Sequence, residues 1–303
     1  EALRRIAFDD LFAIQLTVQD RKRRWQKTGD APQITSHHLS SNFINNLPFN
    51  MTASQKRVLH EIQGDLKHSK PMSRLLEGDV GSGKTVVALA AMLDTIESGF
   101  QTVLMAPTEV LAEQHYRTIC KLLSGEEDLP LQGFLQVSEK SLKAVLLTGS
   151  TKAKNRKEIL NAIKYGGAQI IIGTHSLIQE SVNFSRLGLA VVDEQHRFGV
   201  LQREQLRKQG REALDIQNTP HLLVMSATPI PRSLALTVFG DLDLSVIDQM
   251  PAGRTSIETK WLPPNKRASA FQHVRSEIEE GRQIFVICPL VEDSEAIQSR
   301  AAI

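Results

Sequence analysis

Short apolar runs alternate with helical patterns through most of the chain after Met51. The apolar runs are SRLLEG, TVLMAP, AVLLTG, QIIIGTH, LAVVDE and HLLVMSAT, each ending in small, polar or charged residues. Segments with helical spacing lie between them, such as 85–97 and 109–123. Strands that alternate with helices predict an α/β fold with a central, mostly parallel sheet covered on both faces. Because the carboxyl ends of such strands form one crevice, we expect the functional site there.

The first 26 residues show a different pattern. Apolar residues recur at helical spacing from Ala2 to about Gln26, and RKRRWQK then places five basic residues in seven. This predicts one amphipathic helix with a basic end, and we favour a solvated face over a nucleic-acid contact for its charges. We expect residues 28–42 to form a loop. Residues 124–141, rich in turn residues and acids, predict a surface excursion.

The chain predicts a domain boundary at DQMPAGRTS (248–256), which combines proline, glycine and polar residues. We therefore expect a helical linker segment over 1–46, a nucleotide-binding lobe over 47–247, a linker over 248–256 and the start of a second lobe over 257–303. A helix and a strand, QIFVICPL, are predicted in that last part. It is shorter than most domains, and the chain lacks an initiator methionine, so we expect a fragment of a longer protein.

Composition narrows the class of protein without identifying it. Apolar residues make up 41% of the chain and charged residues 23%, as in ordinary soluble globular proteins. A net charge of +2 is too small to indicate a partner. Cys120 and Cys288 stand far apart, which argues against a disulfide framework or a cysteine-based zinc site and fits a reducing cytosol. No apolar run approaches the roughly 18 residues of a membrane span.

The strongest chemical signal is GDVGSGKT, between a predicted strand and a predicted helix. It matches G-x-x-x-x-G-K-[ST], the loop that binds the phosphates of nucleotides. Its glycines allow the backbone N–H groups to face phosphate oxygens, near the positive end of the following helix. Lys84 would reach the terminal phosphates of ATP, and the Thr85 hydroxyl would bind Mg²⁺. The predicted cofactor-binding residues of this loop are Gly78, Asp79, Val80, Gly81, Ser82, Gly83, Lys84 and Thr85.

Two adjacent acids, Asp193 and Glu194, complete the predicted site. They end the apolar run LAVVDE, about 110 residues after the phosphate loop. Such a site needs one acid for the metal and one for the attacking water. Asp193 would bind Mg²⁺ through its water shell, and Glu194 would orient and deprotonate the water. The predicted catalytic residues are thus Glu194 and Lys84, and the predicted metal ligands are Thr85 and Asp193.

Six segments stand in an order that resembles a known family: GDVGSGKT, APTEVLAEQH, LLTGS, IIIGTH, VVDEQHRFGV and MSATPIPRSLA. They resemble the motifs of superfamily-two helicases and translocases, and most of all the RecG-type ATP-dependent DNA helicases. The resemblance implies a RecA-like P-loop lobe, a second RecA-like lobe beginning after the linker, and a preceding helix that follows a wedge domain. It also implies ATP-driven remodelling of branched DNA, such as replication forks and Holliday junctions, in recombination and repair.

The resemblance assigns roles to further residues. Phe49 would stack on adenine and Gln55 would bind its edge, whereas the residues alone equally suggest a core ring and a helix cap. His196 would act in catalysis by touching the segment from Ser226 to Thr228, which couples nucleotide state to DNA contact.

Four residues match the positions at which the family's first lobe holds one DNA strand by its phosphates. They are Thr108, Thr148, Gly149 and Thr174. Contacts of this kind fix register and carry no sequence information. Ordinary capping of strand ends by threonine and glycine explains each of the four equally well.

Other readings remain open. A transcription-repair coupling translocase usually continues Asp-Glu-Glu-Gln, whereas this chain has Gln195 and His196, and primosomal helicases lack the RFGV that follows. A binding module that no longer hydrolyses ATP, or an ATPase that acts on protein, would also carry the phosphate loop. The family's arginine fingers lie in the second lobe, so we expect this chain alone to be weakly active.

The resemblance also implies partners and a location. DNA bound through its phosphate backbone is the expected partner, with single-strand-binding protein as a second. We expect a monomer, no membrane contact, and a place in the bacterial cytoplasm near the nucleoid or in an organelle of bacterial origin.

Overall fold

The structure is a computed structural model. It describes residues 30–125, 130, 132–137, 140–178, 182–193, 219–228, 242–251 and 258–287, together with scattered positions between 5 and 23. These scattered positions are all helical, as the amphipathic pattern predicts. The chain divides into two compact units, Glu1–Gly253 and Arg254–Ile303, and the division falls inside the predicted linker. Among the described helices, none combines the length and apolar character that a bilayer span requires.

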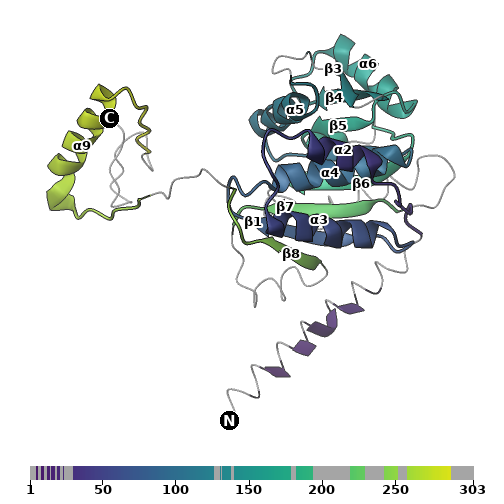
Figure 1. The fold of residues 1–303 in the computed structure, drawn as a ribbon, viewed down its shortest axis with the longest axis horizontal. Helices are drawn as coiled ribbons and strands as arrows, with labels where there is room; N and C mark the ends of the chain where they lie inside the picture. The colour runs from purple at the N-terminus through teal and green to yellow at the C-terminus, as the bar shows by residue number, and fades with distance from the viewer. Residues whose placement is uncertain are drawn as a thin grey trace. The chain divides into compact units, whose positions relative to one another are not determined.

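One sheet organises the first unit (Figure 1). Its strands are β1 (Ser73–Gly78), β2 (Gln101–Met105), β3 (Gln132–Val137), β4 (Lys140–Leu147), β5 (Ile170–Gly173), β6 (Leu187–Asp193), β7 (His221–Ser226) and β8 (Asp243–Ile247). They lie in the order β3-β4-β5-β2-β6-β7-β1-β8, and every neighbouring pair is parallel except β3 and β4. The six predicted strands are confirmed as β1, β2, β4, β5, β6 and β7, and the predicted α/β class is confirmed with them.

Helices cover both faces of this sheet. They are α2 (His38–Asn45), α3 (Ala53–Leu66), α4 (Lys84–Glu97), α5 (Glu109–Ser124) and α6 (Ala153–Lys164), and a 3₁₀ turn spans His175–Ile178. Successive side chains of a strand point to opposite faces. Thus Leu104 on β2 joins the cluster under α2 to α5, while its neighbour Val103 joins the cluster under α6. The central strands β2, β5, β6 and β7 are buried on both sides, which is why they appear as continuous apolar runs.

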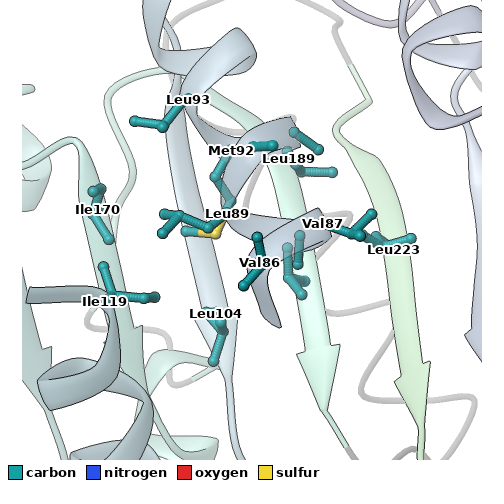
Figure 2. Packing of buried hydrophobic residues seen from close by; sticks show 14 of the residues in the cluster. Val86, Val87, Leu89, Met92, Leu93, Leu104, Ile119, Ile170, Leu189 and Leu223 are labelled. Atoms are coloured by element: carbon teal, nitrogen blue, oxygen red, sulfur yellow. The ribbon is translucent and has the colours of Figure 1, made fainter. Parts of the chain in front are cut away.

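Helix α4 is apolar on all sides and is buried on all sides. Every residue from Val86 to Ile96 is buried. One side of the helix packs on the sheet, where Val87, Leu89 and Met92 share a cluster with Leu104 and Leu189 (Figure 2). Helices α2 and α3 contact α4 as well. A helix without a polar face is stable only when protein surrounds it, so α4 requires both layers.

The predicted loop over 28–42 is wrong from His38 onward, because α2 begins there. No side chain of its own caps this helix. Instead the carboxylate of Glu97, at the end of α4, accepts a hydrogen bond from the backbone N–H of Leu39 at 3.1 Å, which also lowers the pKa of Glu97. An acid at a helix N-terminus is stabilising wherever it comes from in the sequence. The start of α2 is therefore stabilised by a tertiary contact and not by a cap within its own sequence.

The predicted surface excursion over 124–141 is also wrong in part. Residues 132–137 form β3, which pairs antiparallel with β4 at the edge of the sheet. Its side chains alternate, with Leu135 and Val137 buried and Phe134 exposed. This alternation marks a strand with one face on the core.

In the second unit, the described residues contain a 3₁₀ turn (Pro264–Lys266) and helix α9 (Arg267–Glu279). The predicted strand over 283–290 is not formed in its described part, residues 283–287. Phe285 and Ile287 are 86% and 92% exposed there. A strand needs a hydrogen-bonded neighbour, and the described part of this unit contains none.

His221 on β7 connects the sheet to the segment before α2. Its Nδ1 accepts a hydrogen bond from the backbone N–H of Met72 at 3.0 Å, and its Nε2 donates to the carbonyl of Pro32 at 2.7 Å. The neutral ring thus satisfies both neighbours, and burial lowers its pKa from 6.5 to about 4. A proton on Nδ1 would face the N–H of Met72.

This pKa predicts a loss of stability in mild acid. A group with a lowered folded pKa takes up its proton first in the unfolded state, so stability falls as the pH drops below 6.5 toward 4. On going from pH 7 to pH 5, protonation of His221 in the unfolded state should lower the free energy of unfolding by about 2 kcal/mol. Urea unfolding at both pH values should show a smaller pH-dependent loss for His221→Gln than for the native chain. His68→Gln, at an exposed position, should keep the native loss; equal losses in all three proteins would contradict the assignment.

Candidate functional site

A cleft of about 630 Å³ lies at the carboxyl ends of the central strands. The loops after β1, β2 and β7, the last residue of β6 and helix α5 contribute to it. The lining residues are Val80, Gly81, Lys84, Thr85, Pro107, Thr108, Leu111, Gln114, His115, Thr118, Asp193, Met225 and Ala227. The crevice expected from parallel topology therefore exists, and it contains Lys84, Thr85 and Asp193 from segments far apart in the sequence.

The phosphate loop has the backbone that its glycines allow. Gly81 and Gly83 have φ angles of 79° and 87°, in the left-handed region that favours glycine. A Cβ on Gly78 would lie 2.6 Å from the Ser82 hydroxyl and 3.2 Å from Cβ of Ile247, so a larger residue there would displace its neighbours. Lys84 donates to the carbonyls of Gly78 and Asp79 at 2.6 and 2.9 Å. These bonds hold the lysine across the loop, close to where the terminal phosphates of a nucleotide would lie.

Gln55 connects this loop to helix α3. Its Oε1 accepts a hydrogen bond from the backbone N–H of Thr52 at 2.8 Å, so Gln55 is the N3 residue of a capping box. Its Nε2 donates to the carbonyl of Ser82 at 2.7 Å. A Cβ at Gly83 would collide with this amide nitrogen. Gln55 is 2% exposed, so it acts as a buried link between the helix cap and the phosphate loop.

The two residues predicted to recognise adenine do not line the cleft. Phe49 lies in the loop between α2 and α3 and is 43% exposed. Gln55 is engaged by Thr52 and Ser82, as its alternative reading as a helix cap requires. Their role toward adenine stays a prediction.

The predicted metal ligands Thr85 and Asp193 line the same cleft. A hydroxyl and a carboxylate fit Mg²⁺, which takes oxygen ligands and keeps several waters and substrate phosphates around it. In the described part of the chain no group of three or more His, Cys, Asp or Glu residues could hold a metal ion. Thr85 and Asp193 fit the usual pattern of Mg²⁺ in phosphoryl-transfer sites, where one or two protein oxygens join substrate phosphates and waters. Glu194, Gln195 and His196 lie outside the described residues.

The residues predicted to contact DNA lie at the same edge of the sheet, but they differ in exposure and in hydrogen bonding. Thr108 caps α5 by accepting the N–H of Leu111 at 3.3 Å, and it also lines the cleft. Thr148 and Thr174 are 3% and 8% exposed. Their hydroxyls are close to those of Ser150 and Ser176, at 3.0 and 3.4 Å. These local bonds agree with strand-end capping, and the DNA contacts stay predictions.

The structure also describes Gly149 and the segment from Ser226 to Thr228, to which the resemblance assigns the coupling of nucleotide state to DNA contact. Gly149 is exposed, and the adjacent Ser150 N–H donates to the carboxylate of Glu109 at 3.1 Å. Hydrogen bonds from the Ser150 side chain, first of all, and from the backbone N–H groups of Ser150 and Gly149 lower the pKa of Glu109. The Ser226 and Thr228 hydroxyls lie 2.9 Å apart, at the end of β7. The turn after β7 is therefore ordered by its own side chains.

Sequence reasoning missed His115. Its Nε2 lies 2.7 Å from Oδ2 of Asp193, and both side chains are 13% exposed. His115 is the last residue of APTEVLAEQH, one of the segments that carry the family resemblance, but the resemblance assigned no role to it. Gln114 and Thr118, on the same helix, line the cleft without having been singled out.

The phosphate loop, the acid at the end of β6 and the central parallel strands together define a RecA-like P-loop lobe of the helicase type. The model of the DEAD/DEAH box helicase family matches residues 52–237. The chain belongs to this family, and with it comes a nucleotide site for ATP.

Three curated relatives are each named ATP-dependent DNA helicase RecG, and each matches the whole chain. The relative from Thermotoga maritima is 42% identical over 303 residues, which is 36% of its length. Those from Synechocystis and Streptococcus pneumoniae are 46% and 45% identical, over 34% and 42% of their lengths. The chain thus spans well under half of the length of these relatives.

Solved structures agree with the fold. RecG bound to a three-way DNA junction superposes with a TM-score of 0.78 at 40% identity, covering 95% of this chain and 36% of that one. The DEAD-box helicase Mss116, bound to single-stranded RNA, gives 0.56 at 18% identity, covering 82% and 51%. At that identity the second likeness supports the fold alone.

The geometry of Gln55 predicts a separable effect on phosphate binding. Gln55→Glu keeps an acceptor for the capping box, but it cannot donate to the carbonyl of Ser82. An unsatisfied buried carbonyl costs about 1–3 kcal/mol, so affinity for ATP should fall about tenfold. Binding of inorganic triphosphate should fall as well, because the defect lies in the loop. Fluorescence titrations measure both, with Lys56→Ala as an exposed control; a loss confined to ATP would indicate adenine recognition instead.

Proposed function

We propose that this chain is the first motor lobe, with the beginning of the second, of an ATP-driven helicase that remodels branched DNA. The observation that carries the proposal is the 42–46% identity to RecG helicases over the whole chain, together with 40% identity to the solved RecG structure over 95% of it. The structure solved with a three-way junction supports DNA as the partner. The identity extends beyond the family motifs, which favours this reading over a transcription-repair translocase.

The residues of the cleft have distinct tasks in ATP hydrolysis. Lys84 would exchange its bonds to the loop carbonyls for bonds to the terminal phosphates. Thr85 and Asp193 would hold Mg²⁺, which neutralises charge on the phosphates when bound. Glu194, one residue after β6, would orient the attacking water and accept its proton. His196 would relay the state of this site to Ser226 and Thr228.

The DNA side lies at the ends of neighbouring strands. Backbone N–H groups near Gly149 and Thr108 would hold phosphates of one strand, which fixes the register of the motor without reading bases. Closure of two lobes on ATP and reopening after hydrolysis would move that strand stepwise. An arginine from the second lobe would complete the transition state.

We further propose a monomeric protein of the bacterial cytoplasm, or of an organelle of bacterial origin, with single-strand-binding protein as an additional partner. Family resemblance supports these points.

Two substitutions test the motor reading. Glu194→Gln should keep nucleotide and DNA binding but lower ATP hydrolysis about 10²–10⁴-fold, because the water loses its base. Lys84→Ala should lose nucleotide binding itself. Steady-state hydrolysis with a three-way junction, a linear duplex and no DNA measures these effects, and the junction should stimulate most.

The comparison needs both this chain and the longer protein that contains it. Stimulation only in the longer protein fits the role of a second lobe. Hydrolysis in neither would favour a binding module, and hydrolysis indifferent to DNA would favour an ATPase that acts on protein.

A further inference from the structure

Helix α5 is held firmly against the sheet. Its inner face buries Ala112, Tyr116, Ile119 and Cys120. The Tyr116 hydroxyl donates to the carbonyl of Pro130 at 2.6 Å, and burial raises the pKa of Tyr116 above its usual range. Thr108 caps the first turn. The backbone that carries the side chains on the cleft side of this helix is therefore fixed in position.

His115 occupies such a position. It lines the nucleotide cleft, and its Nε2 is 2.7 Å from Oδ2 of Asp193. A carboxylate only accepts hydrogen bonds, so Nε2 carries the hydrogen and donates it. At 13% exposure each, the two side chains are largely shielded from water, which would otherwise compete for this bond. The contact spans 78 residues of sequence.

The bond restricts the aspartate that is assigned to Mg²⁺. An aspartate side chain can rotate about two bonds, and a hydrogen bond to Oδ2 restricts both rotations. Oδ1 is then left to face the water shell of the metal. Hydrogen-bonded partners of metal-binding carboxylates orient them, and removing such a partner typically costs about 10–100-fold in metal affinity or activity.

We propose that His115 is a positioning residue that fixes the carboxylate of Asp193 in the orientation required for Mg²⁺. The proposal rests on the proposed function, because it takes Asp193 as the acid of an ATP·Mg²⁺ site. It adds a residue of α5 to a site otherwise built from the phosphate loop and the end of β6. In this proposal His115 acts through Asp193, and we assign it no direct part in binding the nucleotide or the attacking water.

The test separates metal binding from nucleotide binding. His115→Leu removes the donor at similar size, whereas His115→Gln keeps an amide N–H at comparable reach. Titration of Mg²⁺ into each variant with a fluorescent ATP analogue gives the Mg²⁺ concentration at half-maximal tightening of nucleotide binding. We expect this concentration to rise about tenfold in His115→Leu and less than about threefold in His115→Gln. Binding of the analogue in EDTA should stay at the native level in both.

Controls decide between positioning and simple structural damage. Arg117→Gln changes an exposed residue of the same helix and should leave the Mg²⁺ requirement unchanged. An unchanged requirement in His115→Leu would overturn the proposal, and so would an equal loss of binding with and without Mg²⁺. Equal effects of leucine and glutamine would also overturn it, because the donor would then be irrelevant. Native protein whose ATP hydrolysis ignores DNA would contradict the proposed function while leaving this titration interpretable.

Discussion

Burial of helix α4 on every side determines where the nucleotide site can form. The helix has no polar face, so it needs the sheet beneath it and α2 and α3 around it. Its N-terminus follows directly from the phosphate loop after β1. Fixing α4 in the core thus fixes Lys84 and Thr85 relative to the neighbouring strands, and brings the positive end of the helix to the cleft. The catalytic geometry is a consequence of hydrophobic packing.

Two acids of α4 show how this burial is made compatible with polar groups. Asp94 is fully buried, accepts a hydrogen bond from Gln63 at 2.8 Å and lies 2.9 Å from His37, while burial raises its pKa. Glu97, one turn later, holds the start of α2. Buried polar groups are stable when partnered. These partners also join the covering layer to α4, so the same side chains that would weaken the core determine which helices surround it.

Sequence patterns predicted the parts whose signal is local. Buried parallel strands are continuous apolar runs, and the phosphate loop is a contiguous motif, so both could be found. Helix α2 could not, because its capping acid Glu97 lies 58 residues away from Leu39. The edge strands β3 and β8 were missed because one face is solvated and the apolar runs are broken. In β8, Asp243 and Val246 are exposed, and the buried Ser245 accepts a hydrogen bond from Arg74. An element whose position depends on residues distant in sequence cannot be recognised from its local sequence pattern.

The same distinction applies within the site. The motif identified Lys84, Thr85 and Asp193 because their chemistry requires those residue types at that spacing. Sequence reasoning singled out Gln55 only as an adenine-binding residue or a helix cap, and it assigned His115 no role. The structure shows that these residues hold the loop and the acid from two different helices. A phosphate loop without the Gln55 amide would have the same motif but a less ordered Ser82 and Gly83, and an aspartate without His115 could turn away from the metal. The motif therefore specifies the reacting groups, whereas the precision of their placement comes from residues that perform no chemistry.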